Sequence, residues 1–261
     1  MMQLDRLTLG RMAKELGFVR DTLEKVCRLA DVLKFMESDE LLAEAIALKG
    51  GTAINLTIFD LPRLSVDIDL DYCRSIDREK MLADRDIITD KISKYMSANG
   101  YTLSPKSKNY HALDSFVYEY VNCGGVKDNI KLEINYMLRC HVLPVARRKV
   151  KLPWNEEKLT VLSVAPLEIF ASKTVALLTR TAPRDLDPVL RKGERFDLEM
   201  TQKKVREYLV SILRTTEEEE MFWKAFAEGR YCPELIFGAT AEYTNVEKHP
   251  MALWKCRDKG K

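Results

Sequence analysis

The chain has 261 residues, of which 46% are hydrophobic and 31% are charged. That length can bury one large core or two smaller packed units. Lysine and arginine total 42 and aspartate and glutamate total 40, so the formal net charge is only +2. This balance excludes a protein that holds nucleic acid through its overall charge, and any such attraction must come from local patches.

The sequence shows no secretory or membrane-spanning pattern. Residues 1–6 lack the apolar run of a signal peptide, and no stretch approaches the roughly 20 apolar residues that span a bilayer. The 6 cysteines are scattered without a Cys-x-x-Cys pair, and the 3 histidines are dispersed. These patterns predict reduced thiols in a cytoplasmic protein with no membrane partner, and they disfavour a zinc site or a histidine-based triad.

Periodic apolar residues and capping residues predict several helices in the first half of the chain. The predicted helices are 19–36, a short one capped by Ser38 or Asp39, a short one opened by Thr52 and reaching Ile58, and 77–98. Strict alternation of apolar and polar residues predicts strands. The predicted strands are 66–71, two runs between 101 and 139 joined by a Gly124-Gly125 turn, and 159–163.

From Pro166 onward the pattern changes to helices. Pro166 suits the first position of a helix, and Thr201 and Thr216 are placed to cap two more. The residues after about 230 show no regular pattern. We therefore predict an α+β protein with a mixed-sheet core over residues 1–163 and a mainly helical region over residues 164–261.

Asp67, Asp69 and Asp71 are the strongest chemical signal in the sequence. On a strand, residues two apart point to the same face and lie about 6–7 Å apart. Three carboxylates on one face repel one another unless a cation neutralises them, and such oxygen ligands suit one divalent ion or a pair about 3.5–4 Å apart. The alternative is a solvated acidic face on an edge strand.

A glycine turn just upstream favours the cation. In Leu48-Lys49-Gly50-Gly51-Thr52, a strand, two glycines and a small hydroxyl residue that opens a helix place backbone N–H groups where a phosphate can bind. Glycine matters because a side chain would hold the phosphates away from the backbone. An ordinary strand-to-helix turn is the alternative, but together the turn and the acidic strand predict a site for Mg²⁺ and a triphosphate.

Two residues further along the chain fit such a site. A third carboxylate is expected from a neighbouring strand, and Glu133 fits by the polar alternation of residues 131–135, although a solvent-facing residue would show the same pattern. Lys173 shares a helical stripe with apolar residues, where an ammonium needs an anionic partner. The triphosphate or Asp185 would provide one; alternatively, the stem of the lysine packs while its head reaches water.

With these residues assembled, the chain resembles the abortive-infection nucleotidyltransferase toxins (AbiEii/AbiGii-like) of type IV toxin–antitoxin systems. Residues 48–56 resemble the first block of that family, and Arg63-Leu64-Ser65-Val66-Asp67-Ile68-Asp69-Leu70 closely matches its Arg-Phe-Ser-x-Asp-Ile-Asp-Leu block. Glu133-Ile134-Asn135 resembles the third-carboxylate strand. Ala171-Ser172-Lys173 with Pro183-Arg184-Asp185-Leu186 resembles the helical block that carries the essential lysine and aspartate. The resemblance spans roughly residues 45–190.

The resemblance implies a DNA polymerase beta-like nucleotidyltransferase fold, with a mixed sheet and flanking helices. It also implies dependence on Mg²⁺ (or Mn²⁺), an NTP substrate, nucleotide addition to the 3′ end of tRNA, and a cognate antitoxin. The roles that it implies are metal binding by Asp67, Asp69 and Glu133, nucleotide binding by Gly50, Gly51, Thr52 and Lys173, and catalysis by the three carboxylates with Lys173 and Asp185. The family usually has a second acid three residues after that last aspartate, where this chain has Pro188 next to Asp187, so either aspartate is a candidate.

The acceptor is left open by the residues themselves. The basic runs 147–151 and 203–206 can contact a tRNA backbone, or they are simply solvated faces. Transfer to a protein side chain or to a small molecule would use the same fold. A catalytically silent binding protein is the remaining alternative, and the intact carboxylates argue against it.

Overall fold

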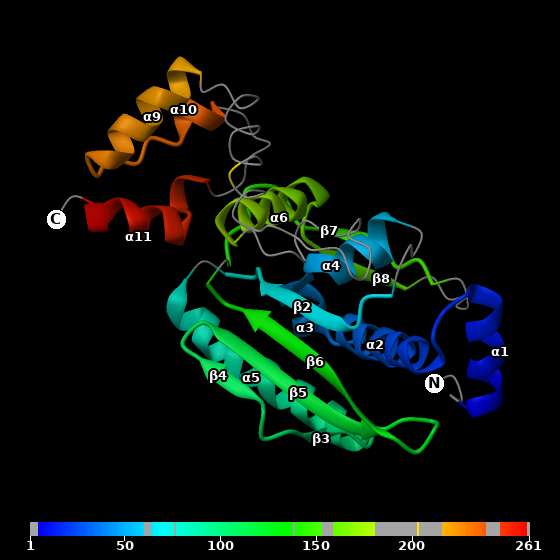
Figure 1. Cartoon of the computed structure of the whole chain (residues 1–261). Coiled ribbons are helices and arrows are strands. Elements are labelled where there is room, and N and C mark those ends of the chain that lie inside the picture. The colour runs from blue at the N-terminus through cyan, green and yellow to red at the C-terminus, as the bar shows by residue number, and fades with distance from the viewer. Residues whose placement is uncertain are drawn as a thin grey trace. The chain divides into compact units, whose positions relative to one another are not determined.

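The computed structural model describes residues 5–59, 64–75, 77–137, 139–152, 159–180, 203, 216–238 and 246–259 (Figure 1). The chain divides into two compact units, one of Met1–Ala165 with Thr244–Met251 and one of Pro166–Tyr243 with Ala252–Lys261. Among the helices that the structure describes, none is both long and apolar enough to cross a membrane.

The first unit is built on a mixed sheet. Its described strands follow the order β3-β5-β6-β2-β1-β8-β7, with β4 paired to β5. The pairs β2–β6 and β1–β8 are parallel and the others are antiparallel. The strands are β1 (Ile46–Leu48), β2 (Asp67–Tyr72), β3 (Thr102–Leu103), β4 (Lys108–Tyr110), β5 (Leu113–Val121), β6 (Lys127–Asn135), β7 (Ala146–Lys149) and β8 (Thr160–Ser163).

The described helices of this unit are α1 (Arg6–Leu16), α2 (Arg20–Ser38), α3 (Glu40–Ala45), α4 (Gly50–Ala53), the π-helical η1 (Ile54–Ile58), α5 (Arg78–Ala98) and the short 3₁₀ helix η2 (Val246–Lys248). Asp39 caps α3 by accepting a hydrogen bond from the backbone N–H of Leu42, which confirms one of the two predicted caps. The rings of Phe35 and Tyr95 stack with centroids 3.9 Å apart and join α2 to α5. The helix expected to open at Thr52 begins two residues earlier, since α4 starts at Gly50.

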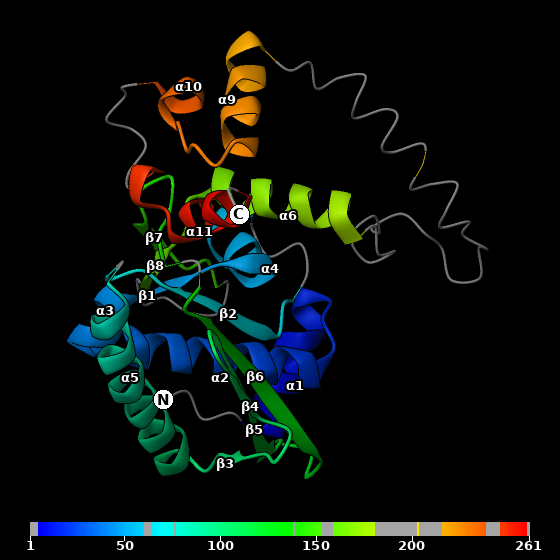
Figure 2. The same ribbon diagram turned by 90° about the vertical axis from the view of Figure 1, so that its left-hand side faces the viewer.

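The alternation of side chains divides the sheet into an apolar face and an acidic face. Along β2, Ile68, Leu70 and Tyr72 are buried, and the Tyr72 hydroxyl donates to Asp84 of α5 at 2.7 Å. Figures 1 and 2 show α2 and α3 on one side of β2 and α4 on the other. The apolar residues of β2 therefore complete the core beneath the long helices, and the aspartates face α4.

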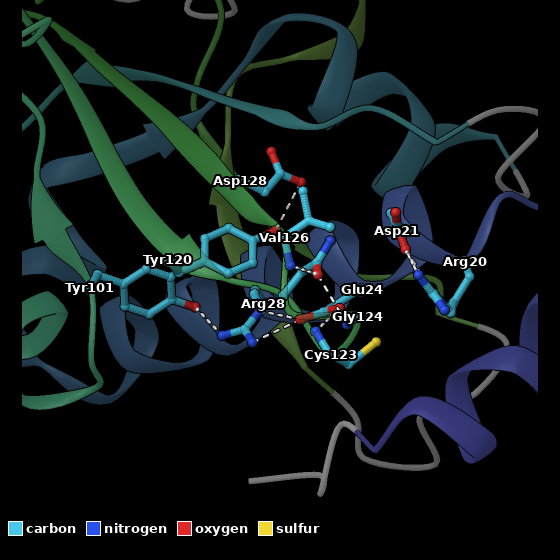
Figure 3. A network of polar contacts seen from close by, with 11 residues as sticks. Arg20, Asp21, Glu24, Arg28, Tyr101, Tyr120, Cys123, Gly124, Val126 and Asp128 are labelled. Atoms are coloured by element: carbon cyan, nitrogen blue, oxygen red, sulfur yellow. Dashed lines mark hydrogen bonds and ion pairs between the residues drawn. The ribbon is translucent and has the colours of Figure 1, made fainter.

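A buried ion pair fastens α2 to the turn between β5 and β6 (Figure 3). Glu24 is fully buried and accepts hydrogen bonds from Arg28 at 2.8 Å and from the backbone N–H of Cys123 at 2.9 Å. The Arg28 guanidinium lies 4.2 Å from the centre of the Tyr120 ring. On the next strand, Asp128 pairs with Lys25 at 2.7 Å. These contacts hold β6 at one height along the sheet, and a shift of one residue there would turn every side chain of β6 to the opposite face.

Glu24→Gln should therefore lower the free energy of unfolding by about 2–3 kcal/mol, since it leaves the Arg28 charge without its anion. We place the loss below that of a fully buried pair because the Arg28 side chain is 20% exposed. Urea denaturation of the full chain measures it, with Glu15→Gln on the exposed side of α1 as control. A loss equal to that of the control would mean that the pair does not hold the turn.

The regular secondary structure that the structure describes in the second unit is helical. The unit contains α6 (Pro166–Arg180), α9 (Glu217–Ala227), α10 (Glu234–Phe237) and most of α11 (Pro250–Lys259). The predicted cap at Thr216 is confirmed, and Glu219 completes a capping box. Phe222, Phe226 and Cys256 form a small core with Tyr231 and Leu235. The helix expected after Thr201 lies outside the described residues, apart from Lys203, which is helical.

The residues after about 230, where the sequence shows no regular pattern, include the helices α10 and α11. Only a few side chains of these helices are buried, so the apolar period that marks a helix is weak in them. The expected fold class is confirmed: a mixed sheet with flanking helices, followed by a helical C-terminal part.

Candidate active site

The strand β2 lies in the interior of the sheet, with β6 on one side and β1 on the other. Its aspartates therefore do not form the solvated face of an edge strand. Their exposure decreases along the strand, since Asp67 is exposed, Asp69 is half-buried and Asp71 is only 3% exposed. Carboxylates in the interior of a sheet need a partner or a function, because desolvation of the charge is costly.

The parallel pairing of β2 with β6 brings the second predicted carboxylate to the first. Asp69 and Glu133 are register partners, so their side chains leave adjacent strands on the same face. Glu133 accepts a hydrogen bond from the Ser115 hydroxyl at 2.9 Å and pairs with the Lys131 ammonium at 3.0 Å. These bonds fix one oxygen of Glu133 beside Asp69, which is the arrangement expected of a third carboxylate on a neighbouring strand.

Negative charge is concentrated at Asp69. Burial raises the pKa of this carboxyl, and the charges of Glu133 and Asp67 raise it further, while Lys49 and Lys131 partly offset them. The net shift is upward even with two lysines nearby. Burial is the largest cause of this shift, and the neighbouring carboxylates add to it.

Asp71 differs from the other two aspartates of the strand. Its carboxylate accepts a hydrogen bond from the Lys49 ammonium at 2.5 Å, and both side chains are largely buried. Lys49 therefore neutralises Asp71, which is not one of the three predicted metal ligands. Lys49 also donates its backbone N–H to the carbonyl of Asp69 at 2.9 Å, so one residue ties the glycine turn to β2 at two points.

The glycine turn lies directly against Asp69. Gly50 has a φ of +70°, and a Cβ built there would overlap the Asp69 carboxylate and lie 3.1 Å from its Cγ. This positive φ lies where the chain leaves β1 and turns into α4. The first N–H groups of a helix have no partner within it, so the amides of this turn are available to an anion.

The side chain of Thr52 is directed inward. It is fully buried, and its hydroxyl bonds with the hydroxyl of Ser65 at 2.8 Å and with the carbonyl of Asp67. Thr52 thus fixes the entry into β2. Any contact of this residue with a phosphate would come from its backbone N–H.

The carboxylates fit a hard divalent cation by their chemistry and charge. In the part of the chain that the structure describes, no three aspartate, glutamate, histidine or cysteine side chains are already gathered as a metal site. Asp67, Asp69 and Glu133 nevertheless supply oxygen donors from adjacent strands, and the charges of Glu133 and Asp67 help to raise the pKa of Asp69. A cation bound there would reduce the repulsion between these carboxylates.

Of the site residues predicted in the helical half, Lys173 lies within the described residues. Lys173 lies on α6, and its side chain is exposed, so the expectation of an ammonium set in a buried stripe is wrong. The exposed placement agrees with the alternative of a lysine head in water. Asp185, Asp187 and Arg63 lie outside the described residues.

Three residues of the site have no role in the sequence prediction. Lys49 bonds to Asp71, and both Lys131 and Ser115 bond to Glu133. Lys131 had a signal in the sequence, because it lies two residues before Glu133 on the same face of a predicted strand. Ser115 had none, since its position depends on the pairing of β5 with β6.

An acidic interior strand beside a glycine turn, on a mixed sheet with flanking helices, is the arrangement of a nucleotidyltransferase. The chain belongs to the family of nucleotidyl transferase AbiEii toxins of type IV toxin–antitoxin systems, whose family model matches residues 34–222. The protein is thus a nucleotidyltransferase toxin, and the resemblance seen in the sequence is confirmed.

Among solved structures, the chain is similar to MenT4, a nucleotidyltransferase toxin from Mycobacterium tuberculosis H37Rv. The TM-score is 0.49 and the identity is 17%, over 98% of this chain and 88% of that one. No curated protein sequence gives a significant match.

Proposed function

We propose that this toxin transfers a nucleotidyl group from an NTP to the 3′ end of a tRNA. The observation that carries the proposal is the placement of Asp69 between Glu133, its register partner, and the Gly50 turn. The acceptor hydroxyl attacks the α-phosphorus, a new P–O bond forms, and the α–β phosphoanhydride bond breaks. Pyrophosphate leaves, and the hydroxyl proton is lost to water.

The residues of the first unit supply position and charge for this transfer. Asp67, Asp69 and Glu133 would hold Mg²⁺ or Mn²⁺, and the chemistry that such an ion supplies when bound is neutralisation of the triphosphate. The N–H groups of Gly50 and Gly51 bind phosphate oxygens at the helix end. Glu133, held by Ser115, orients the acceptor hydroxyl. No histidine base is needed, because positioning and charge carry most of such a transfer.

We propose further that residues 164–261 complete the active site, with Lys173 and either Asp185 or Asp187 as their contribution. This assignment rests on the family block around Lys173.

Lys173→Met should then lower the turnover by about a hundredfold or more, since a cation on the leaving phosphates is lost. The melting temperature should stay the same, because the side chain is exposed. Lys224→Met, which removes another exposed lysine from the same unit, is the control and should keep full activity. Unchanged turnover in Lys173→Met would remove this residue from the site.

Incubation of the purified chain with each labelled NTP, Mg²⁺ and total tRNA tests the proposed reaction. The proposal is supported if label appears on intact tRNA but does not appear on tRNA whose 3′-terminal ribose was oxidised before the reaction. Label on protein, or on a small molecule, would replace tRNA with that acceptor.

As a toxin of a type IV system, the chain is also expected to have an antitoxin, and coexpression with the neighbouring gene should relieve its effect on growth.

A further inference from the structure

Lys131 is a fourth charged residue on the acidic face, and the proposed function gives it no task. It is the register partner of Asp67 and lies two residues before Glu133 on β6. The side chain is 40% exposed, so it is neither part of the core nor fully in water. The parallel register therefore places one ammonium among the three carboxylates that would bind a metal.

Lys131 and Ser115 both contact one carboxylate oxygen of Glu133, a proposed metal ligand. Its Nζ lies 3.0 Å from Oε1 of Glu133, and the Ser115 hydroxyl donates to that oxygen at 2.9 Å. A carboxylate oxygen has about two acceptor positions. Both positions on Oε1 are thus taken by protein donors.

Lys131 supplies a positive charge within this group of carboxylates. Its ammonium pairs with Glu133, and its strand position is the register partner of Asp67. Lys49, the other nearby lysine, is bonded to Asp71. Lys131 is therefore the described lysine that pairs directly with one of the three proposed metal ligands.

A divalent ion that approaches these carboxylates meets that positive charge at Glu133. Repulsion at distances of a few ångströms weakens its binding. A bound NTP offsets this repulsion, because its phosphates bring several negative charges to the same face of the sheet. The ammonium then has a new partner and can leave Glu133 to the metal.

We propose that Lys131 is a resident counter-ion that competes with the metal for Glu133 when no nucleotide is bound and moves to the triphosphate when the NTP binds. Metal binding is thereby coupled to nucleotide binding, and the metal alone binds weakly. The inference rests on the proposed function for the metal and the NTP, and it adds a reason why the two must arrive together.

Calorimetric titration of Mn²⁺ without nucleotide tests the competition. Lys131→Met should bind Mn²⁺ at least about tenfold more tightly than the unaltered chain. Lys131→Arg keeps the charge and should bind Mn²⁺ as the unaltered chain does. Lys127→Met is the matched control, because Lys127 lies on the same strand and face about 13 Å away, and it should leave the affinity unchanged.

A second titration, with the complex of Mn²⁺ and a non-hydrolysable NTP analogue, should show the opposite sign. Lys131→Met loses the contact with the triphosphate and should bind this complex severalfold more weakly. Equal Mn²⁺ affinity of Lys131→Met and the unaltered chain would overturn the inference, and so would an equal gain in Lys127→Met.

The outcomes also separate this inference from the proposed function. Tighter Mn²⁺ binding in Lys131→Met, with no transfer to tRNA by the unaltered chain, would support the counter-ion and refute the acceptor. An absence of Mn²⁺ binding in both Lys131→Met and the unaltered chain would overturn the counter-ion and the metal assignment together.

Discussion

Asp69→Asn should abolish nucleotide transfer, with a fall in turnover of at least about a thousandfold. Asp69 is the one carboxylate that meets both Glu133 across the strand pair and the Gly50 turn above it. The substitution keeps the size of the side chain but removes the charge that a cation needs. Incorporation of label from NTP into the acceptor measures the loss.

The same substitution should stabilise the folded chain at neutral pH. The pKa of Asp69 is raised above its ordinary value of 3.8, so the folded protein binds this proton more tightly than the unfolded chain does. The stability that comes from protonation is present at acid pH and is lost as the pH rises through the raised pKa. Ionised Asp69 is thus unfavourable at pH 7, and Asp69→Asn should raise the melting temperature.

Asp90→Asn on the exposed side of α5 makes the same change of charge away from the site and serves as the control. It should alter neither turnover nor melting temperature appreciably. A loss of activity in Asp69→Asn together with a lower melting temperature would point to misfolding. Full activity would refute the metal assignment.

Gly50→Ala should lose both activity and stability. A Cβ there overlaps the Asp69 carboxylate, and the φ of +70° is unfavourable for any side chain. We expect a loss of about 1–3 kcal/mol in stability and of about a hundredfold in turnover, because the carboxylate has to move from its position.

Gly17→Ala separates the two causes. Gly17 has nearly the same φ, +71°, but a Cβ there meets nothing within 4 Å. It should therefore show the loss of stability from backbone strain without the loss of activity. If Gly50→Ala is as active as Gly17→Ala, then the turn does not position Asp69.

Local patterns predicted the elements that carry the site. The alternation along β2 and β6 places Asp69 and Glu133 each on a polar face, because period two is a property of any strand. The helical spacing of apolar residues over 77–98 predicted α5, in which Met81, Ile88 and Ile92 are buried. Each of these features depends only on neighbours in the sequence.

The relations between elements were not predictable in this way. Alternation says that β2 and β6 are strands, but it does not say that they pair in parallel with Asp69 opposite Glu133. That register depends on the crossover through α5 and on the buried contacts of Glu24 with the β5–β6 turn. The pairing of Lys49 with Asp71 was hidden for the same reason, since the two residues meet only when β1 aligns antiparallel to β2.

The strand β7 ends the sheet among the described strands, and three of its four residues, Arg147, Arg148 and Lys149, are cationic. A sheet edge offers unpaired backbone groups to a second copy of the chain. A copy that added its own β7 would bring like charges face to face, which is unfavourable. This run therefore opposes edge-to-edge self-association, so replacing its three cations with threonine would favour concentration-dependent oligomers.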